Sequence, residues 1–114
     1  MKINISEKQR LVIIAALDAY SRLQMGQLWA VAEVVQGCKD KHGKPLPDYW
    51  DIRHEHTDAL TRALFDYPGN ASHGICSQHV PDTAKIAYDL QCVLAGVERQ
   101  HQICKSEPLA EVAT

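Results

Sequence analysis

The sequence predicts a small, mainly α-helical bundle of about four helices, and three observations carry that prediction. Apolar residues recur three and four positions apart in several stretches, which is the spacing of one helix face. Residues typical of helix starts and helix ends bound these stretches. Strand signals are weak, because residues 2–5 alternate polar and apolar and could form a short N-terminal strand, but no second run pairs with them.

The first helix should begin near Glu7, because Ser6 and Gln9 have the spacing of a capping box. From Leu11 to Leu17 this helix is apolar on almost every side, which is more than one core-facing side requires. Because so short a chain has little else to cover the surplus face, we expect another copy of the same protein to pack there.

Two further helices should follow, separated by a basic loop. Residues 27–36 carry apolar side chains at helical spacing, and Gly37 suits the position just past a helix end. The loop at 38–47 is rich in lysine. Asp48 suits the N-cap of a third helix that runs to about Phe65. We expect the buried side of that helix to comprise Ile52, Ala59, Leu60, Ala63 and Leu64.

A long loop and a last helix make up the remainder. A loop as long as 66–81 is generally either functional or disordered in a compact domain, and its apolar residues favour an ordered loop. Pro81 suits the first position of the last helix, which should have a polar end near residues 100–105. We therefore expect a single helical domain over 1–107 and a frayed tail at 108–114.

Composition and charge are ordinary for a soluble protein and argue against several functions. The chain has 114 residues, 46% of them hydrophobic, and a formal net charge of −2, so it lacks the basic surface that stable DNA or RNA binding needs. No stretch is long enough to span a membrane, and the N-terminus lacks a signal-peptide pattern. The cysteines form no C-x-x-C pair, and we expect all to be reduced thiols in a cytosol, namely Cys38, Cys76, Cys92 and Cys104.

Two short motifs place polar side chains beside apolar helix, where packing alone does not require them. The first, residues 20–27 (YSRLQMGQ), contains Arg22, whose guanidinium would need carboxylate, carbonyl or phosphate partners if it were buried. The second, residues 69–74 (GNASHG), has glycine at both ends and can turn backbone N–H groups toward one anion. Together the motifs predict a site for a planar anionic ligand, and a nucleotide is the obvious class.

Each motif also has a purely structural interpretation. Arg22 lies one helical turn after Asp18 and could simply pair with it at the surface. Asn70 could adopt the left-handed turn conformation that asparagine tolerates. Several aromatic residues could stack on a base or pack in the core, namely Trp29, Tyr49, Trp50 and Tyr67. Three loop lysines could hold a phosphate or face solvent, namely Lys39, Lys41 and Lys44.

Histidine and cysteine positions raise two catalytic alternatives. His54-Glu55-His56 could hold a metal, but residues two apart point to nearly opposite sides of a helix, and the His-Glu-x-x-His spacing is absent. Cys76 could be a nucleophile with a neighbouring histidine as base, but such partners usually come from distant segments, so a small buried thiol is favoured. The further candidate metal ligands are His73, Cys76, His79 and His101. We predict no metal site, no cofactor and no enzymatic activity.

The two motifs resemble those of a family of short proteins found in tailed-phage and prophage genomes. The sequence is also similar to the phage Thoeris anti-defence sponges, which are small oligomeric proteins that sequester cyclic ADP-ribose-type immune signals without cleaving them; some also hold cyclic oligonucleotides. This resemblance implies that Arg22 grips a phosphate and that Asn70 contacts a base or ribose. Relatives carry an aromatic residue and an arginine within the last helix, whereas residues 90–95 (LQCVLA) have neither. The next arginine along the chain is Arg99, and Arg53 and Arg62 on the third predicted helix are the arginines that could substitute.

We therefore predict a non-enzymatic phage counter-defence protein that sequesters a nucleotide-type immune signal, either a cyclic ADP-ribose variant or a cyclic oligonucleotide, in the host cytoplasm. Its other partner should be itself, as a dimer-based homo-oligomer, with a hexamer as one option. The alternatives are an interaction protein that inhibits a host or defence protein through a helical surface, and a metal-dependent hydrolase. The predicted ligand-binding residues are Tyr20, Arg22, Gln27, Arg53, Asn70, Ser72, His73 and Arg99.

Overall fold

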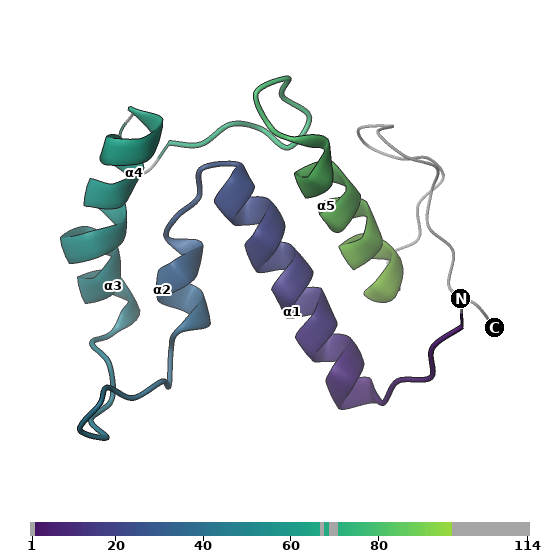
Figure 1. Cartoon of the computed structure of the whole chain (residues 1–114), viewed down its shortest axis with the longest axis horizontal. Helices are drawn as coiled ribbons and strands as arrows, with labels where there is room; N and C mark the ends of the chain where they lie inside the picture. The colour runs from purple at the N-terminus through teal and green to yellow at the C-terminus, as the bar shows by residue number, and fades with distance from the viewer. Residues whose placement is uncertain (1, 67, 69–70, 97–114) are drawn as a thin grey trace. The chain divides into compact units, whose positions relative to one another are not determined.

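The protein is mainly helical, as predicted. A computed structural model describes residues 2–66, 68 and 71–96. These residues form four helical segments (Figure 1): α1 (Glu7–Gln24), α2 (Ala30–Val34), the continuous run of α3 (Tyr49–Ile52), η1 (Arg53–Thr57) and α4 (Asp58–Phe65), and α5 (Asp82–Leu94). Within those ranges no residue belongs to a β-strand, so residues 2–5 are not the strand that their alternation allowed.

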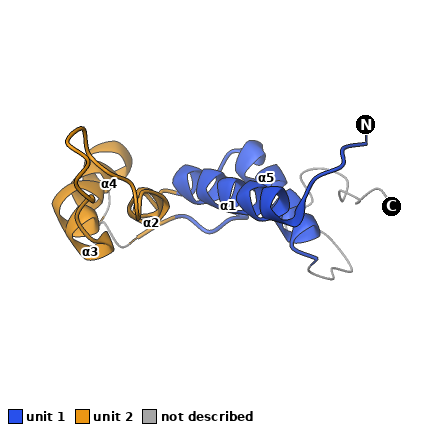
Figure 2. Ribbon diagram, turned by 90° about the horizontal axis from the view of Figure 1, so that it is seen from below, with its two compact units in different colours: residues 1–25, 73–114 blue, residues 26–72 orange. Residues whose placement is uncertain are grey.

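The chain divides into two compact units (Figure 2). Unit 1 comprises residues 1–25 and 73–114, and unit 2 comprises residues 26–72. The predicted single domain over 1–107 stays a prediction, and the predicted frayed tail lies outside the described residues.

Helix α1 of unit 1 begins where the capping box predicts. The Ser6 hydroxyl accepts a hydrogen bond from the Gln9 backbone N–H at 3.1 Å, and the Gln9 side-chain oxygen accepts one from the Ser6 N–H at 2.8 Å. These two bonds satisfy backbone donors that a helix start otherwise leaves without partners. The helix ends at Gln24, just before Gly26, whose φ of +92° suits a residue without a side chain.

Helices α1 and α5 pack antiparallel in unit 1 (Figure 1). Hydrogen bonds connect the two helices along their length. Thr83 donates to Gln24 at 3.0 Å, Gln91 donates to Asp18 at 3.3 Å, and Arg10 donates to the Leu94 carbonyl. The apolar side chains that become fully buried in this unit are small or medium in size, namely Val80, Ala84 and Ala87. Unit 1 therefore has a modest core of its own.

Unit 2 begins with a helix shorter than predicted. Helix α2 covers only Ala30–Val34 of the predicted 27–36, and its buried residues are Ala30 and Ala32, next to the buried Leu28. The predicted N-cap of the following helix is confirmed, since the Asp48 carboxylate accepts the Asp51 N–H at 3.0 Å.

The buried side of α4 differs from the prediction. Ile52 is buried as expected, but the other predicted core residues are exposed, namely Ala59, Leu60, Ala63 and Leu64. Thr57 and Thr61 are buried in their place. The reason is the π-helical turn η1, because its i→i+5 bonding shifts every later side chain around the helix relative to an uninterrupted α-helix.

The two buried threonines keep their hydroxyl groups satisfied. Thr57 donates to the Arg53 carbonyl at 3.1 Å, and Thr61 donates to the Thr57 carbonyl at 2.8 Å. A buried hydroxyl without a partner would be costly, so these bonds make the threonine face compatible with burial.

The prediction of four reduced thiols is wrong. Cys38 and Cys92 are free, but Cys76 is exposed and bonded in a disulfide, so it is not a small buried thiol either. The absence of a C-x-x-C pair does not exclude a disulfide, because a disulfide depends on which Cα atoms the fold brings together. Separately, the described helices include none that is both long and apolar enough to cross a membrane.

The capping box gives a direct stability test. Ser6→Ala should lower the free energy of unfolding by about 1 kcal/mol, because it removes the acceptor of the Gln9 N–H. Urea denaturation measures the change. Lys2→Ala is the control, since Lys2 is exposed outside the helix; equal losses for the two variants would contradict the capping role.

Candidate functional site

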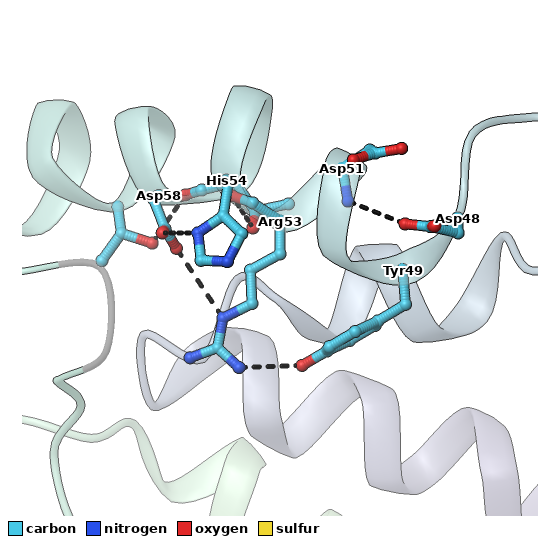
Figure 3. A network of polar contacts seen from close by, with 8 residues as sticks. Asp48, Tyr49, Asp51, Arg53, His54 and Asp58 are labelled. Atoms are coloured by element: carbon cyan, nitrogen blue, oxygen red, sulfur yellow. Dashed lines mark hydrogen bonds and ion pairs between the residues drawn. The ribbon is translucent and has the colours of Figure 1, made fainter.

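The most elaborate polar arrangement in unit 2 surrounds Arg53, at the start of η1 (Figure 3). The Arg53 side chain is 18% exposed. Its Nη1 donates a hydrogen bond to the Tyr49 hydroxyl at 2.9 Å, and its Nε lies 3.9 Å from the Asp58 Oδ1. The Asp58 distance allows ion pairing but is too long for a hydrogen bond.

Three aromatic rings lie around the same guanidinium. The central carbon of the Arg53 guanidinium is 4.7 Å from the ring centroid of Trp29, 5.8 Å from that of Trp50 and 6.0 Å from that of Tyr49. At such distances the negative face of an aromatic ring attracts a cation, most strongly for tryptophan. We call these residues, together with Asp58 and His54, the Arg53 cluster.

The π-helical turn explains why Arg53 and Asp58 meet. Residues five apart point about 140° away from each other on an α-helix, at 3.6 residues per turn. In η1 the Asp58 N–H bonds to the Arg53 carbonyl, five residues earlier, which brings both side chains to the same side. Single π-helical turns are frequently found at functional sites.

The outer side of the Arg53 cluster carries two flat, exposed rings. Trp50 is 59% exposed and stacks on His54, with ring centroids 5.8 Å apart and planes 17° apart. The His54 Nδ1 lies 3.4 Å from the Asp58 Oδ2, so the predicted one-face relation of His54 and Asp58 is confirmed (Figure 3). Trp50 therefore remains largely open to solvent, although it is stacked on His54.

The cluster retains unused hydrogen-bonding capacity. A guanidinium has five N–H donors, and the described residues give Arg53 one hydrogen bond, to Tyr49. The Asp58 Oδ1 is buried and accepts no hydrogen bond from any described residue. The arrangement can therefore take an additional anionic acceptor at Arg53, while Trp50 offers a stacking surface.

The predicted ligand residues of unit 1 lie on and after α1. Tyr20 is exposed. The Arg22 Nε lies 3.4 Å from the Asp18 Oδ2, so Arg22 forms the ion pair with Asp18 that the sequence offered as its structural role. The His73 ring lies 5.1 Å from the His79 ring, and the His73 N–H donates to the Met25 carbonyl at 2.9 Å, which ties the loop to the end of α1.

Unit 2 holds the remaining described candidates. The Gln27 side chain donates to the Ser72 hydroxyl at 3.4 Å, so the structure brings these two together through a long hydrogen bond. Arg53 lies in the cluster described above. Asn70 and Arg99 lie outside the described residues, so the convergence of Arg22 with Asn70 stays a prediction.

Sequence reasoning missed Asp58 as a partner of Arg53 and His54 as a stacking partner of Trp50. Part of the cluster had a signal in the sequence, because Tyr49 with Arg53 and Trp50 with His54 are both four apart, on one helix face. The Arg53–Asp58 pair had none, since the spacing of five fits only the π-helical turn.

The predicted absence of a metal site stays a prediction. No three histidine, cysteine, aspartate or glutamate side chains in the described part of the chain lie close enough to hold an ion. His54 is turned to Asp58, and His56 lies 3.9 Å from Glu55.

Comparisons with known proteins add no relative. No protein-family model matches the sequence, and neither a curated protein nor a solved structure matches it.

The hydrogen bond from Arg53 to Tyr49 yields a matched pair of variants. Tyr49→Phe should lower the free energy of unfolding by about 1 kcal/mol, because it takes an acceptor from a largely buried cation. Tyr20→Phe should leave stability within about 0.5 kcal/mol, since Tyr20 is exposed and its hydroxyl bonds to no described residue. Urea denaturation measures the free energy of unfolding of both variants. Equal losses of stability would contradict a contribution from the hydrogen bond between Arg53 and Tyr49.

Proposed function

We propose that the protein binds and sequesters an anionic nucleotide-type ligand, without turning it over, in the Arg53 cluster. The observation that carries this proposal is the guanidinium of Arg53, largely out of solvent, over the Trp29 ring and beside the exposed ring of Trp50. A cation and an exposed stacking ring side by side are the two features that recognise a phosphate and a base together.

The binding mode follows from the chemistry of the cluster. A base stacks on Trp50, a contact worth about 1–3 kcal/mol in proteins that bind nucleic-acid bases. A phosphate oxygen accepts a charge-assisted hydrogen bond from the unused donors of Arg53. Asp58 keeps the guanidinium in place, because its Oδ1 lies 3.9 Å from the Arg53 Nε.

Sequestration suits such a site better than turnover. A sponge needs high affinity and slow release, and a site with its rings and cation already in place loses little entropy on binding. The resemblance to phage counter-defence proteins supplies the setting: the ligand is an immune signal of the host, a cyclic ADP-ribose variant or a cyclic oligonucleotide.

One observation favours a second candidate function, inhibition of a host or defence protein through a helical surface. The exposed side of α4 is apolar over two turns, since Leu60 and Leu64 are 46% and 66% exposed beside the exposed Ala59 and Ala63. Apolar faces of this kind are common at protein interfaces. For this function, Leu64→Glu abolishes capture of the partner protein, whereas it leaves nucleotide binding intact.

Tryptophan fluorescence tests the proposal at the site itself. Both tryptophans of the chain, Trp29 and Trp50, contact Arg53, so their emission reports on the cluster alone. In a panel of cyclic ADP-ribose isomers and cyclic di- and trinucleotides, one compound should change the emission at one ligand per chain and be recovered intact. At a hundred times its dissociation constant it should add about 2.7 kcal/mol to the free energy of unfolding.

The variants identify the contacts. Arg53→Lys should weaken binding about 10-fold or more, because it loses the planar donor fork, and Trp50→Ala should do the same by removing the stacking ring. Arg62→Lys is the matched control, since it makes the same substitution at an arginine that is exposed on α4. The proposed site would be refuted if no compound of the panel changed the tryptophan emission of the folded protein. It would also be refuted if the Arg53 and Arg62 variants lost the same binding affinity.

A further inference from the structure

The side of helix α1 away from α5 is apolar and is exposed over its N-terminal two thirds, whereas Ala19 and Leu23 toward its C-terminal end are half-buried. Its residues hydrogen-bonded to α5 are Arg10, Asp18 and Gln24. Successive residues of an α-helix are rotated by about 100°, which identifies the residues on the opposite side. They form an apolar stripe with one charged residue, Lys8, at its N-terminal end. We call this stripe the outer face; it comprises Lys8, Val12, Ala15, Ala16, Ala19 and Leu23.

The outer face is not needed by the core of unit 1. Val12 is 67% exposed and its neighbour Leu11 is 53% exposed, while the fully buried apolar side chains of the unit are only as large as valine. Burying apolar surface is the main source of folding stability, so an apolar helix face that stays in water is a loss unless another surface covers it.

An open apolar groove adjoins this face near the start of α1. It is lined by residues of the N-terminal segment and the first two turns of α1, namely Ile3, Asn4, Ile5, Lys8, Gln9, Val12 and Ile13, with a volume of about 560 Å³. Tyr20, 47% exposed, lies on the same flank of α1 as Gln9 and Ile13, because seven and eleven residues are close to whole numbers of turns. Each copy thus carries both a groove and an exposed aromatic side chain of suitable size.

A second copy of the chain fits this arrangement in one orientation. In an antiparallel pair with two-fold symmetry, each flank of a helix faces the same flank of its partner, so Tyr20 of each copy faces the groove of the other. In a parallel pair the Tyr20 flank would face the opposite flank, on which Leu11 lies. The antiparallel pair also brings Lys8 toward the C-terminal end of the partner's α1, where the helix dipole is negative.

We propose that α1 forms an antiparallel homodimer through its outer face, with Tyr20 of each copy inserted into the groove between Ile5, Gln9 and Ile13 of the other. Alanines at the centre of the outer face let the two helix backbones approach closely, and Val12 packs toward each end. The two tyrosine–groove contacts enlarge an interface that a single pair of helices would leave at the small end of stable dimers. Tyr20 is then an interface residue and not a ligand contact.

The oligomeric state tests the interface. Light scattering coupled to size-exclusion chromatography of the full chain should give a dimer, and Val12→Glu and Tyr20→Ala should each raise the dimer dissociation constant at least 10-fold. Leu64→Glu is the matched control, because Leu64 is 66% exposed on α4 and should leave the dimer unchanged. Circular dichroism confirms that each variant stays helical. A wild-type protein that remains monomeric at concentrations on the order of 100 µM would overturn the proposal. A dimer that is disrupted only by Leu64→Glu would also overturn it.

A disulfide trap tests the orientation. In a chain with Cys38→Ser and Cys92→Ser, the double substitution Gln9→Cys with Tyr20→Cys should give covalent dimers under mild oxidation, and Tyr20→Cys alone should give few. The two positions lie about 16 Å apart along one helix, too far to bridge within a copy. Equal cross-linking of the single and double variants would overturn the antiparallel arrangement. Both tests are independent of any nucleotide, so they separate this interface from the ligand site in the Arg53 cluster.

Discussion

The partly desolvated guanidinium of Arg53 is the interaction on which unit 2 depends. Removing such a cation from water is costly unless hydrogen bonds, an opposite charge or aromatic faces compensate for it. Here those contributions come from Tyr49 in α3, Asp58 in α4 and Trp29 just before α2. One side chain therefore holds together helical segments that bury few large apolar residues, and the same side chain is the chemical centre of the proposed ligand site.

The sequence predicted features that depend on residues close along the chain. Ser6 with Gln9 and the Asp48 cap were confirmed because a helix start is decided within one turn. The predicted buried side of α4 was not confirmed, because the π-helical turn rotates the later side chains around the helix and no sequence pattern marks such a turn. The Arg53–Asp58 pair and the placement of Thr57 and Thr61 in the interior both follow from that shift, so they were out of reach.

Unit 1 shows a different limit of sequence reasoning. The apolar character of α1 predicted a surface in need of cover, and Val12 is exposed as that argument requires. A pattern of apolar residues does not state which surface provides the cover; only the groove and the position of Tyr20 suggest an orientation. The disulfide at Cys76 likewise depends on the fold, and since disulfides persist mainly in oxidising compartments, the cytoplasmic location stays a prediction that the cysteines do not support.

The most direct test of the ligand site is NMR of the ¹⁵N-labelled protein, observed at its two indole N–H groups during titration with the compounds of the nucleotide panel. We expect one compound to shift the Trp50 indole resonance strongly and the Trp29 indole resonance less, with saturation at one ligand per chain, because both rings contact Arg53. Binding that leaves both indoles unmoved and perturbs residues around Arg22 would place the ligand in unit 1 and contradict the Arg53 cluster as the site.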